Sequence, residues 1–246
     1  MDRDGAPVGR LLTRRELLAL VGVSGAALAA GAAFLWPRRP RAAEAFPSCV
    51  ARPEQTEGPY FVDERLNRSD IRSDPTSGAV SAGVPLALTF LVSRITRGSC
   101  EPLPAAQVDL WQCDAAGVYS DVADPGFDTV GQKFLRGYQL TDAQGQAVFR
   151  TVYPGWYAGR TVHLHFKVRV PASATNAAEF TSQLYFDDAL TDRVHALPPY
   201  SAKGQRNRRN RDDGIFRRGG DQLLLAPQAV GEGYEASFSL GLQLDD

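Results

Sequence analysis

The sequence predicts an all-β protein, a β-sandwich of about eight to ten strands. The chain of 246 residues contains 23 glycines and 16 prolines, which interrupt it at short intervals, as turns between many short strands require. Between these turns apolar residues take every second position, the period of a half-buried strand, while helical periodicity is scarce. About 200 residues follow the N-terminal segment, which is enough for one sandwich with a full core.

Three stretches show the alternation most clearly. In 85–95 apolar residues occupy every second position from Leu86 onwards, and in 236–244 they do so from Phe238 onwards. The stretch 106–113 follows the same pattern and ends in a turn. We expect all three to be strands that contribute side chains to the core.

The middle of the chain contains further strands. The stretches 134–140 and 147–152 flank the turn-forming residues 141–145, so we expect them to pair as a hairpin. Residues 161–170 alternate again and form the next strand. Two shorter apolar runs are also expected to be strands, at 183–186 and 222–225. Stretches without periodicity are expected to be loops, at 61–83, 98–104 and 121–133. The long loop at 121–133 is of interest because long loops in compact domains are often functional.

The first 45 residues read as an export signal and not as part of the fold. Arg14 and Arg15 precede an apolar run at 17–36 that is rich in alanine and glycine, which is typical of the twin-arginine pathway. The sequence therefore predicts a signal at 1–45 and a mature domain at 46–246, which would be extracellular or associated with the cell envelope. An uncleaved membrane anchor is the alternative, since the apolar run is just long enough to span a bilayer.

The chain contains three cysteines, Cys49, Cys100 and Cys113. In an exported protein this odd number predicts one disulfide and one free thiol. Cys100 and Cys113 flank a predicted strand and are expected to lie at its opposite ends, so Cys49 with Cys100 is the first pairing we expect. A cysteine-based metal site is not indicated, because no Cys-x-x-Cys spacing occurs.

The charge balance does not indicate a nucleic-acid partner. The formal net charge is −1, and basic residues gather only at 203–218. Because aspartates are interspersed in this run, we expect a solvated loop, with polyanion binding as the alternative.

The strand at 161–170 carries the residues most suited to chemistry. His163 and His165 alternate with Val162, Leu164 and Phe166, so both imidazoles project from one face of the strand. Two imidazoles at this separation can bind one metal ion, although a strand whose polar face simply carries two histidines is the plain alternative.

Five motifs occur in a fixed order along the chain: 111–119, 134–145, 154–157, 160–166 and 183–186. The first reads Trp-x-x-Asp-x-x-Gly-x-Tyr, the third Pro-Gly-x-Tyr and the fourth Arg-x-x-His-x-His. This ordered set, which spans about residues 50–245, resembles the intradiol ring-cleavage dioxygenases, the family that contains the catechol and protocatechuate dioxygenases. The resemblance implies a β-sandwich of the intradiol dioxygenase type with long active-site loops.

The resemblance also implies a ligand set for iron. Two tyrosinates, Tyr119 and Tyr157, and two histidines, His163 and His165, would hold Fe(III), and phenolate is a hard anionic donor that suits the ferric state. Ferric iron would lower the pKa of both tyrosines far below about 10. Tyr153 competes with Tyr157 for the second position, because many family members have a longer loop before the histidines.

Other residues match active-site positions of the family. Arg160 would stabilise negative charge on the substrate, although a salt bridge that holds the turn is its alternative role. Gln183 matches a glutamine near the substrate. The remaining matches line the substrate pocket: Thr56, Gly58 and Pro59. His195 lies outside every motif, and we expect it at the surface.

The function that this resemblance implies is ring cleavage. With Fe(III) as cofactor, the chain would use O2 to cleave a catechol-type diol to a muconate-type diacid. The diol and the oligomeric state stay open, and a membrane is a partner only if the signal is uncleaved. One alternative is a secreted, non-catalytic module of transthyretin-like type that binds a ligand or glycan. Another is a zinc hydrolase, which lacks an evident third ligand near the histidine strand.

Overall fold

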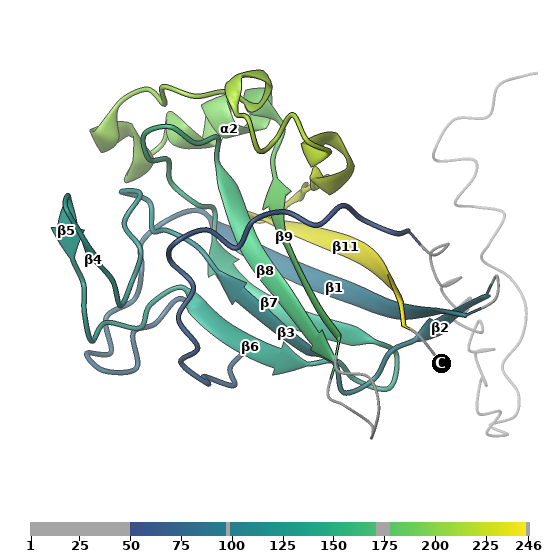
Figure 1. Ribbon diagram of the computed structural model, residues 1–246. Coiled ribbons are helices and arrows are strands. Elements are labelled where there is room, and N and C mark those ends of the chain that lie inside the picture. Colours follow the sequence, from purple (N-terminus) through teal and green to yellow (C-terminus); the bar gives the residue numbers. More distant parts are fainter. Residues whose placement is uncertain (1–49, 97–98, 171–177, 245–246) are drawn as a thin grey trace, which may run out of the picture. The chain divides into compact units, whose positions relative to one another are not determined.

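Two β-sheets contain most of the strands, and they pack face to face in a sandwich (Figure 1). The computed structural model describes residues 50–96, 99–170 and 178–244. These residues all belong to one unit, Phe46–Asp246. The predicted fold class, an all-β sandwich, is confirmed.

The five-stranded sheet has the order β10-β11-β1-β2, with β7 as a further partner of β1. Its central strand β1 runs parallel to β11 and antiparallel to β7. The bounds are β1 (Pro85–Thr96), β2 (Ser99–Pro102), β7 (Gln146–Val152), β10 (Gln228–Val230) and β11 (Gly233–Gln243).

The four-stranded sheet has the order β6-β3-β8-β9, and all its neighbouring strands are antiparallel. The bounds are β3 (Gln107–Trp111), β6 (Arg136–Leu140), β8 (His163–Val170) and β9 (Ala178–Tyr185). A separate two-stranded hairpin consists of β4 (Ala123–Asp124) and β5 (Phe127–Asp128). The described residues thus contain eleven strands, slightly more than expected, because several are only two to four residues long.

Helical segments follow β9 and gather at the end of the four-stranded sheet where β8 begins (Figure 1). They are α2 (Asp188–His195) and three short 3-10 segments, η1 (Tyr200–Lys203), η2 (Asn210–Asp212) and η3 (Gly220–Leu223). Asp187 caps α2, since its side chain accepts hydrogen bonds from the backbone N–H groups of Ala189 and Leu190. The sequence did not predict this helix, because only eight residues form it.

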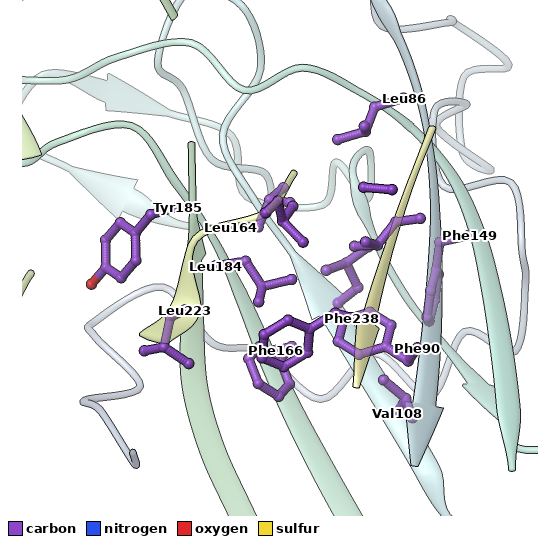
Figure 2. Packing of buried hydrophobic residues seen from close by; sticks show 14 of the residues in the cluster. Leu86, Phe90, Val108, Phe149, Leu164, Phe166, Leu184, Tyr185, Leu223 and Phe238 are labelled. Carbon is purple, nitrogen blue, oxygen red and sulfur yellow. The ribbon is translucent and has the colours of Figure 1, made fainter. Parts of the chain in front are cut away.

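The core lies between the two sheets. Phe90 of β1, Phe166 of β8 and Phe238 of β11 pack together with ring centroids 5.2 to 6.1 Å apart (Figure 2). Burying each such side chain stabilises the fold by about 1.5–3 kcal/mol. Because Phe166 faces the core, His163 and His165 of the same strand project from the opposite, outer face of the four-stranded sheet.

The predicted hairpin of 134–140 with 147–152 is wrong. β6 pairs with β3 in one sheet and β7 pairs with β1 in the other, so residues 141–145 carry the chain from sheet to sheet. A Cβ added at Gly145, where φ is +72°, would lie 2.3 Å from the carbonyl oxygen of Val92 in β1. This close approach fixes the turn against the five-stranded sheet and directs the chain into it.

Three smaller expectations also fail. Residues 222–225 are not a strand, since η3 occupies the first two of them, and the loop at 98–104 contains β2. His195 is not at the surface: it is only 9% exposed, and its Nε2 lies 3.0 Å from the carbonyl oxygen of Pro154. Its side chain is buried because one face of α2 packs onto the core through Leu190 and Val194.

Two of the three cysteines lie in the described residues. Cys113 is a free, buried thiol, and Cys100 is disulfide-bonded. These two cysteines therefore do not pair, as expected, and the expected partner Cys49 lies outside the described residues. The predicted twin-arginine signal lies outside them as well. In the part that the structure describes, no helix is long and apolar enough to cross a membrane.

Candidate metal centre

Four side chains form a row across the outer face of the four-stranded sheet. In the register of the sheet, Trp111 of β3 lies opposite both Arg136 of β6 and His165 of β8, and His165 lies opposite Gln183 of β9. Directly opposite residues share one face of a sheet. The ring of Trp111 stacks on the His165 imidazole, with centroids 5.1 Å apart and planes 9° apart. The sheet thus positions His165 from both sides.

The two histidines of β8 face each other through their Nε2 atoms, which are 3.0 Å apart. His163 Nδ1 lies 2.6 Å from the carbonyl oxygen of Thr161, so Nδ1 carries the proton and Nε2 presents a lone pair. Burial, reinforced by the positive charge of Arg160, lowers the pKa of His163 to about 3 and that of His165 well below its usual value. Both imidazoles are therefore neutral and suited to metal binding.

Two tyrosines complete the cluster. Tyr157 lies with its hydroxyl 3.1 Å from His163 Nε2, to which it donates. Tyr119 is fully buried, and its hydroxyl has no hydrogen-bond partner. The centroid of its ring lies 5.8 Å from that of Tyr157 and 6.2 Å from that of His165. Burial raises the pKa of both tyrosines above the usual value, so both are neutral phenols until a cation lowers their pKa.

The turn before Tyr157 requires glycine. A Cβ added at Gly155 would lie 2.4 Å from the carbonyl oxygen of Ala115. Tyr153, the competing candidate, is directed elsewhere: its hydroxyl lies 2.8 Å from Thr191 Oγ1, and its ring packs on Phe186 at 4.3 Å. The geometry therefore brings Tyr157, and not Tyr153, to the histidines.

Arg160 lies beside the cluster and is held in place by two partners. Its Nε donates to Asp213 Oδ2 at 2.8 Å and its Nη2 donates to Gln183 Oε1 at 2.6 Å, while Nη1 is 3.4 Å from His163 Nε2. Gln183 Nε2 in turn donates to the carbonyl oxygen of Thr56 at 2.8 Å. Arg160 thus makes the salt bridge that was its alternative role and also presents its guanidinium to the histidines.

Asp213 is a functional residue that sequence reasoning missed. It is almost completely buried, and its Oδ2 also accepts the backbone N–H of Thr161 at 2.8 Å. Burial raises the pKa of Asp213, but the backbone hydrogen bonds and Arg160 outweigh it, so the pKa lies below its usual value. The carboxylate is therefore ionised at neutral pH and forms a fixed partner for Arg160.

The basic run at 203–218 is therefore not simply a solvated loop. Asn210 is also buried, and its Oδ1 accepts the Thr161 hydroxyl at 2.6 Å. Within the same run, Arg206 forms ion pairs with Asp188 and Asp192 on α2. The run folds back onto the domain, and its interspersed Asn and Asp residues were the signal that some of it is structural.

The three predicted substrate residues lie at the edge of the cluster. A Cβ added at Gly58, where φ is +74°, would lie 3.2 Å from His165 Cε1, so the backbone passes close to this imidazole. Thr56 contacts Gln183 through its carbonyl oxygen, and Pro59 is exposed. Figure 1 shows this N-terminal segment crossing β8 and β9.

Tyr60 is a second residue that sequence reasoning missed. Its ring stacks on that of Tyr119, with centroids 4.5 Å apart and planes 25° apart, and its hydroxyl donates to Asp124 Oδ2 at 2.8 Å. Burial and the hydrogen bond to Asp124 raise the pKa of Tyr60 to about 12, so it stays a neutral donor. The available signal was an aromatic residue directly after the Gly58-Pro59 match.

The donor set fits a hard, oxidised metal ion. Two imidazole nitrogens and the Tyr157 oxygen lie close together with the Tyr119 ring beside them. Three buried polar atoms of this region have no partner: Tyr119 Oη, His165 Nδ1 and Trp111 Nε1. A phenol oxygen left unpaired in a buried site is destabilising, and a cation would compensate for it. Among the described residues, no three His, Cys, Asp or Glu side chains form a metal-binding group, so the phenols are the oxygen donors at hand.

Comparisons with known proteins agree on a family. A family model described as Dioxygenase matches residues 56–196. The chain is similar to the protocatechuate 3,4-dioxygenase beta chain of Burkholderia cepacia, with 34% identity over 119 residues, 45% of this chain and 50% of that protein. It is similar to the catechol 1,2-dioxygenase of Candida albicans, with 33% identity over 105 residues, 35% of this chain and 33% of that protein. The chain thus spans about half or less of the curated relatives that it matches.

A solved structure extends the similarity over most of the chain. The intradiol ring-cleavage dioxygenase from Tetranychus urticae superposes with a TM-score of 0.69 and 29% identity, covering 79% of this chain and 95% of that one. The fold is therefore shared over most of the chain, and the family match at 56–196 includes the segment that carries the candidate ligands.

Proposed function

The chain belongs to the Dioxygenase family, and from this premise we propose that it is an intradiol ring-cleavage dioxygenase, an oxidoreductase that uses O2 to cleave a catechol-type diol to a muconate-type diacid. The observation that carries the proposal is the convergence of Tyr119, Tyr157, His163 and His165 from separate parts of the chain. A non-catalytic binding module would leave this convergence without a reason.

These four side chains are the proposed ligands of ferric iron. When bound, the iron supplies Lewis acidity that withdraws electrons from a coordinated diol and so makes its ring reactive toward O2. His163 is oriented by its bond to the Thr161 carbonyl, and His165 by the stack on Trp111.

Tyr157 is the proposed acceptor of a diol proton. It is the most exposed of the four donors, and its hydroxyl lies on the side toward Arg160 and His163. Burial makes its free phenolate strongly basic, since its pKa as a phenol is raised. The phenol oxygen can therefore take a proton when the diol occupies the site.

Arg160 is the proposed stabiliser of negative charge on the diol. Asp213 and Gln183 fix its guanidinium before the substrate arrives, so no reorganisation is needed when charge develops. Gln183 also connects Arg160 to the backbone at Thr56, one of the proposed substrate residues. Gly58 and Pro59 would complete that wall of the pocket, where the missing Cβ of Gly58 leaves room against His165.

The purified protein tests this proposal. We expect about one iron per chain, a visible tyrosinate-to-iron colour, and O2 uptake with a subset of a panel of diols. That subset would identify the substrate among catechol, protocatechuate, hydroxyquinol and larger diols. A colourless protein that stays inactive after loading with ferric or ferrous iron would contradict the proposal and favour the binding module. Zinc in place of iron, without colour, would favour the hydrolase.

We also propose that residues 1–45 export the protein through the twin-arginine pathway. The pair Arg14 and Arg15 before the apolar run supports it. Substituting both arginines by lysine should retain the protein inside the cell, whereas unchanged export would contradict the proposal. The N-terminal sequence of the exported protein would show whether cleavage falls near residue 45 or the segment stays as an anchor.

A further inference from the structure

We propose that Tyr60 is a positioning residue for the metal ligand Tyr119, and that Asp124 holds Tyr60 in place. This inference rests on the proposed function and deepens it, because it assigns a role to two residues outside the ligand set. It also gives the β4–β5 hairpin, which carries Asp124, a connection to the site.

Tyr119 needs an external support. Its hydroxyl has no hydrogen-bond partner of good geometry and interacts only with the neighbouring Tyr157 hydroxyl, so contacts of its ring and backbone orient it. The closest ring is that of Tyr60, which lies nearly parallel to it at a centroid distance of 4.5 Å, whereas Tyr157 and His165 meet it edge-on at 5.8 and 6.2 Å. Such an offset stack restricts both the tilt and the position of the ring.

Tyr60 is itself fixed at both ends. Its hydroxyl donates to Asp124 Oδ2 at 2.8 Å, and the other oxygen of Asp124 accepts the backbone N–H of Gly126 in the hairpin turn at 2.9 Å. Its backbone carbonyl accepts Arg136 Nη1 at 3.3 Å. The ring is therefore held between the hairpin and the four-stranded sheet.

Arg136 joins the two tyrosine segments directly. The buried guanidinium that reaches the Tyr60 carbonyl also donates through Nε to Ser120 Oγ at 2.8 Å and through Nη2 to the Ser120 carbonyl. Ser120 follows Tyr119 in the chain. The Arg136 guanidinium thus fixes the backbones at Tyr60 and Ser120 relative to each other. This arrangement supports the stack of Tyr60 on Tyr119.

Four variants separate the ring of Tyr60 from its hydrogen bond. Tyr60→Phe keeps the ring and removes the hydroxyl, and Tyr60→Leu removes the stack. Asp124→Asn keeps an acceptor oxygen, and Asp124→Ala removes it. Tyr138→Leu is the matched control, because Tyr138 is a half-buried tyrosine on the same sheet whose strand partner is Asp109.

The readouts are the position of the tyrosinate-to-iron absorption band, iron per chain, melting temperature, and kcat and KM for the diol. We expect Tyr60→Leu to shift the band and to lower kcat ~10- to 100-fold, as a small misplacement of a reacting group does, with KM little changed. Tyr60→Phe and Asp124→Ala should give smaller shifts in the same direction, and Asp124→Asn should resemble the wild type. Tyr138→Leu should leave the band unmoved.

A double variant tests whether the effect passes through Tyr119. In a Tyr119→Phe background the remaining band would come from Tyr157, and adding Tyr60→Leu should move it much less than in the wild type. An equal shift in both backgrounds would overturn the proposal.

The result that overturns the inference alone is an iron-loaded, coloured wild type whose band and kcat are unchanged by Tyr60→Leu, or changed no more than by Tyr138→Leu. If Tyr60→Leu does not fold, unchanged bands in both Tyr60→Phe and Asp124→Ala overturn it equally. A colourless, inactive wild type would instead overturn the proposed function, and this inference with it.

Discussion

The candidate site has two sides that differ in how completely the protein satisfies them. On the arginine side, formed by Arg160, Thr161, Gln183 and Asp213, each side-chain polar group has a partner within the chain. On the aromatic side, formed by Trp111, Tyr119 and His165, one polar atom of each residue is buried without a partner. Leaving such an atom unpaired costs about 1–3 kcal/mol each.

The difference shows in which part of the site folding alone satisfies the polar groups and in which part a bound ligand is needed. The arginine side is rigid before any substrate arrives, as a group that stabilises developing charge should be. On the aromatic side the unpaired phenol oxygen of Tyr119 is the atom that a cation would satisfy, whereas the Trp111 indole N–H can only donate a hydrogen bond. The first predictions below alter one side and ask whether the other is affected.

The largest effect is expected for Tyr119→Phe on the aromatic side. Removing a metal ligand should lower iron affinity and ring cleavage by more than the ~100-fold that loss of an outer contact to a ligand can cause, although excess iron can still load the variant. Iron analysis and O2 uptake measure it. The metal-free protein should not be destabilised, because the lost hydroxyl had no partner.

Tyr153→Phe is the control, since its hydroxyl is bonded to Thr191. It should keep iron and activity but lose about 0.5–1.5 kcal/mol of unfolding free energy. Tyr119→Phe with normal iron and activity would show that the aromatic side binds no metal through this residue.

A smaller effect is expected for Asp213→Ala on the arginine side. The variant leaves the Arg160 guanidinium without its buried partner. Because a hydrogen bond to a charged group contributes about 1.5–3 kcal/mol, we expect the free energy of unfolding to fall by that amount. We also expect kcat to fall by about 10- to 100-fold through misplacement of Arg160, with iron content unchanged. Denaturant unfolding and steady-state kinetics measure the two effects. Iron loss as large as that of Tyr119→Phe would show that the two sides are not separate.

Gly58→Ala tests the contact of the backbone with His165. The new Cβ would lie 3.2 Å from His165 Cε1, so the imidazole must shift, and iron affinity should fall by about tenfold. Gly78→Ala is the control, because φ there is +75° but no atom lies within 4 Å of the added Cβ. Both variants carry the same backbone strain of about 1–2 kcal/mol, and only Gly58→Ala should change a metal titration. An equal change in both would attribute the effect to strain alone.

The smallest effect is a pH dependence of stability. Because folding lowers the pKa of Asp213, its ion pair stabilises the fold fully above the unfolded pKa of about 3.9, and this contribution is lost as the pH falls through the folded value. In Asp213→Asn the unfolding free energy should therefore fall less than in the wild type as the pH is lowered below about 4.

Asp109 should give a pH dependence of stability opposite to that of Asp213. Burial raises its pKa to about 6 despite Arg169, so it contributes stability that is present below about pH 4 and lost as the pH rises through 6. Asp109→Asn should remove that loss. Denaturant unfolding from pH 3 to 7 measures both effects. If the unfolding free energy of both variants changed with pH as it does in the wild type, both assignments would be contradicted.

The sequence predicted the parts of this structure that depend on local pattern. The alternation around His163 and His165 determines which face they share, and the structure has both on the outer face of β8. The strand at 147–152 was also predicted, but its pairing was wrong, because a period of two does not determine which sheet a strand joins.

The missed residues depend on contacts between distant positions. Asp213 is 53 residues from Arg160, and Asp124 is 64 residues from Tyr60. No pattern around either aspartate distinguishes it from a solvated one, since the partner is brought near only by the packing of loops on the finished sandwich. The residues that hold the site in place, such as Asp213 and Asp124, could therefore not be predicted from the sequence, whereas the histidine strand could.

The visible absorption spectrum of the iron-loaded protein, recorded with Tyr119→Phe, Tyr157→Phe and Tyr153→Phe, tests the central claim most directly. We expect a tyrosinate-to-iron band in the wild type that is shifted or lost in the first two variants and unchanged in Tyr153→Phe. A wild type without such a band after iron loading, or a band that only Tyr153→Phe removes, would contradict the assignment of iron to these four side chains.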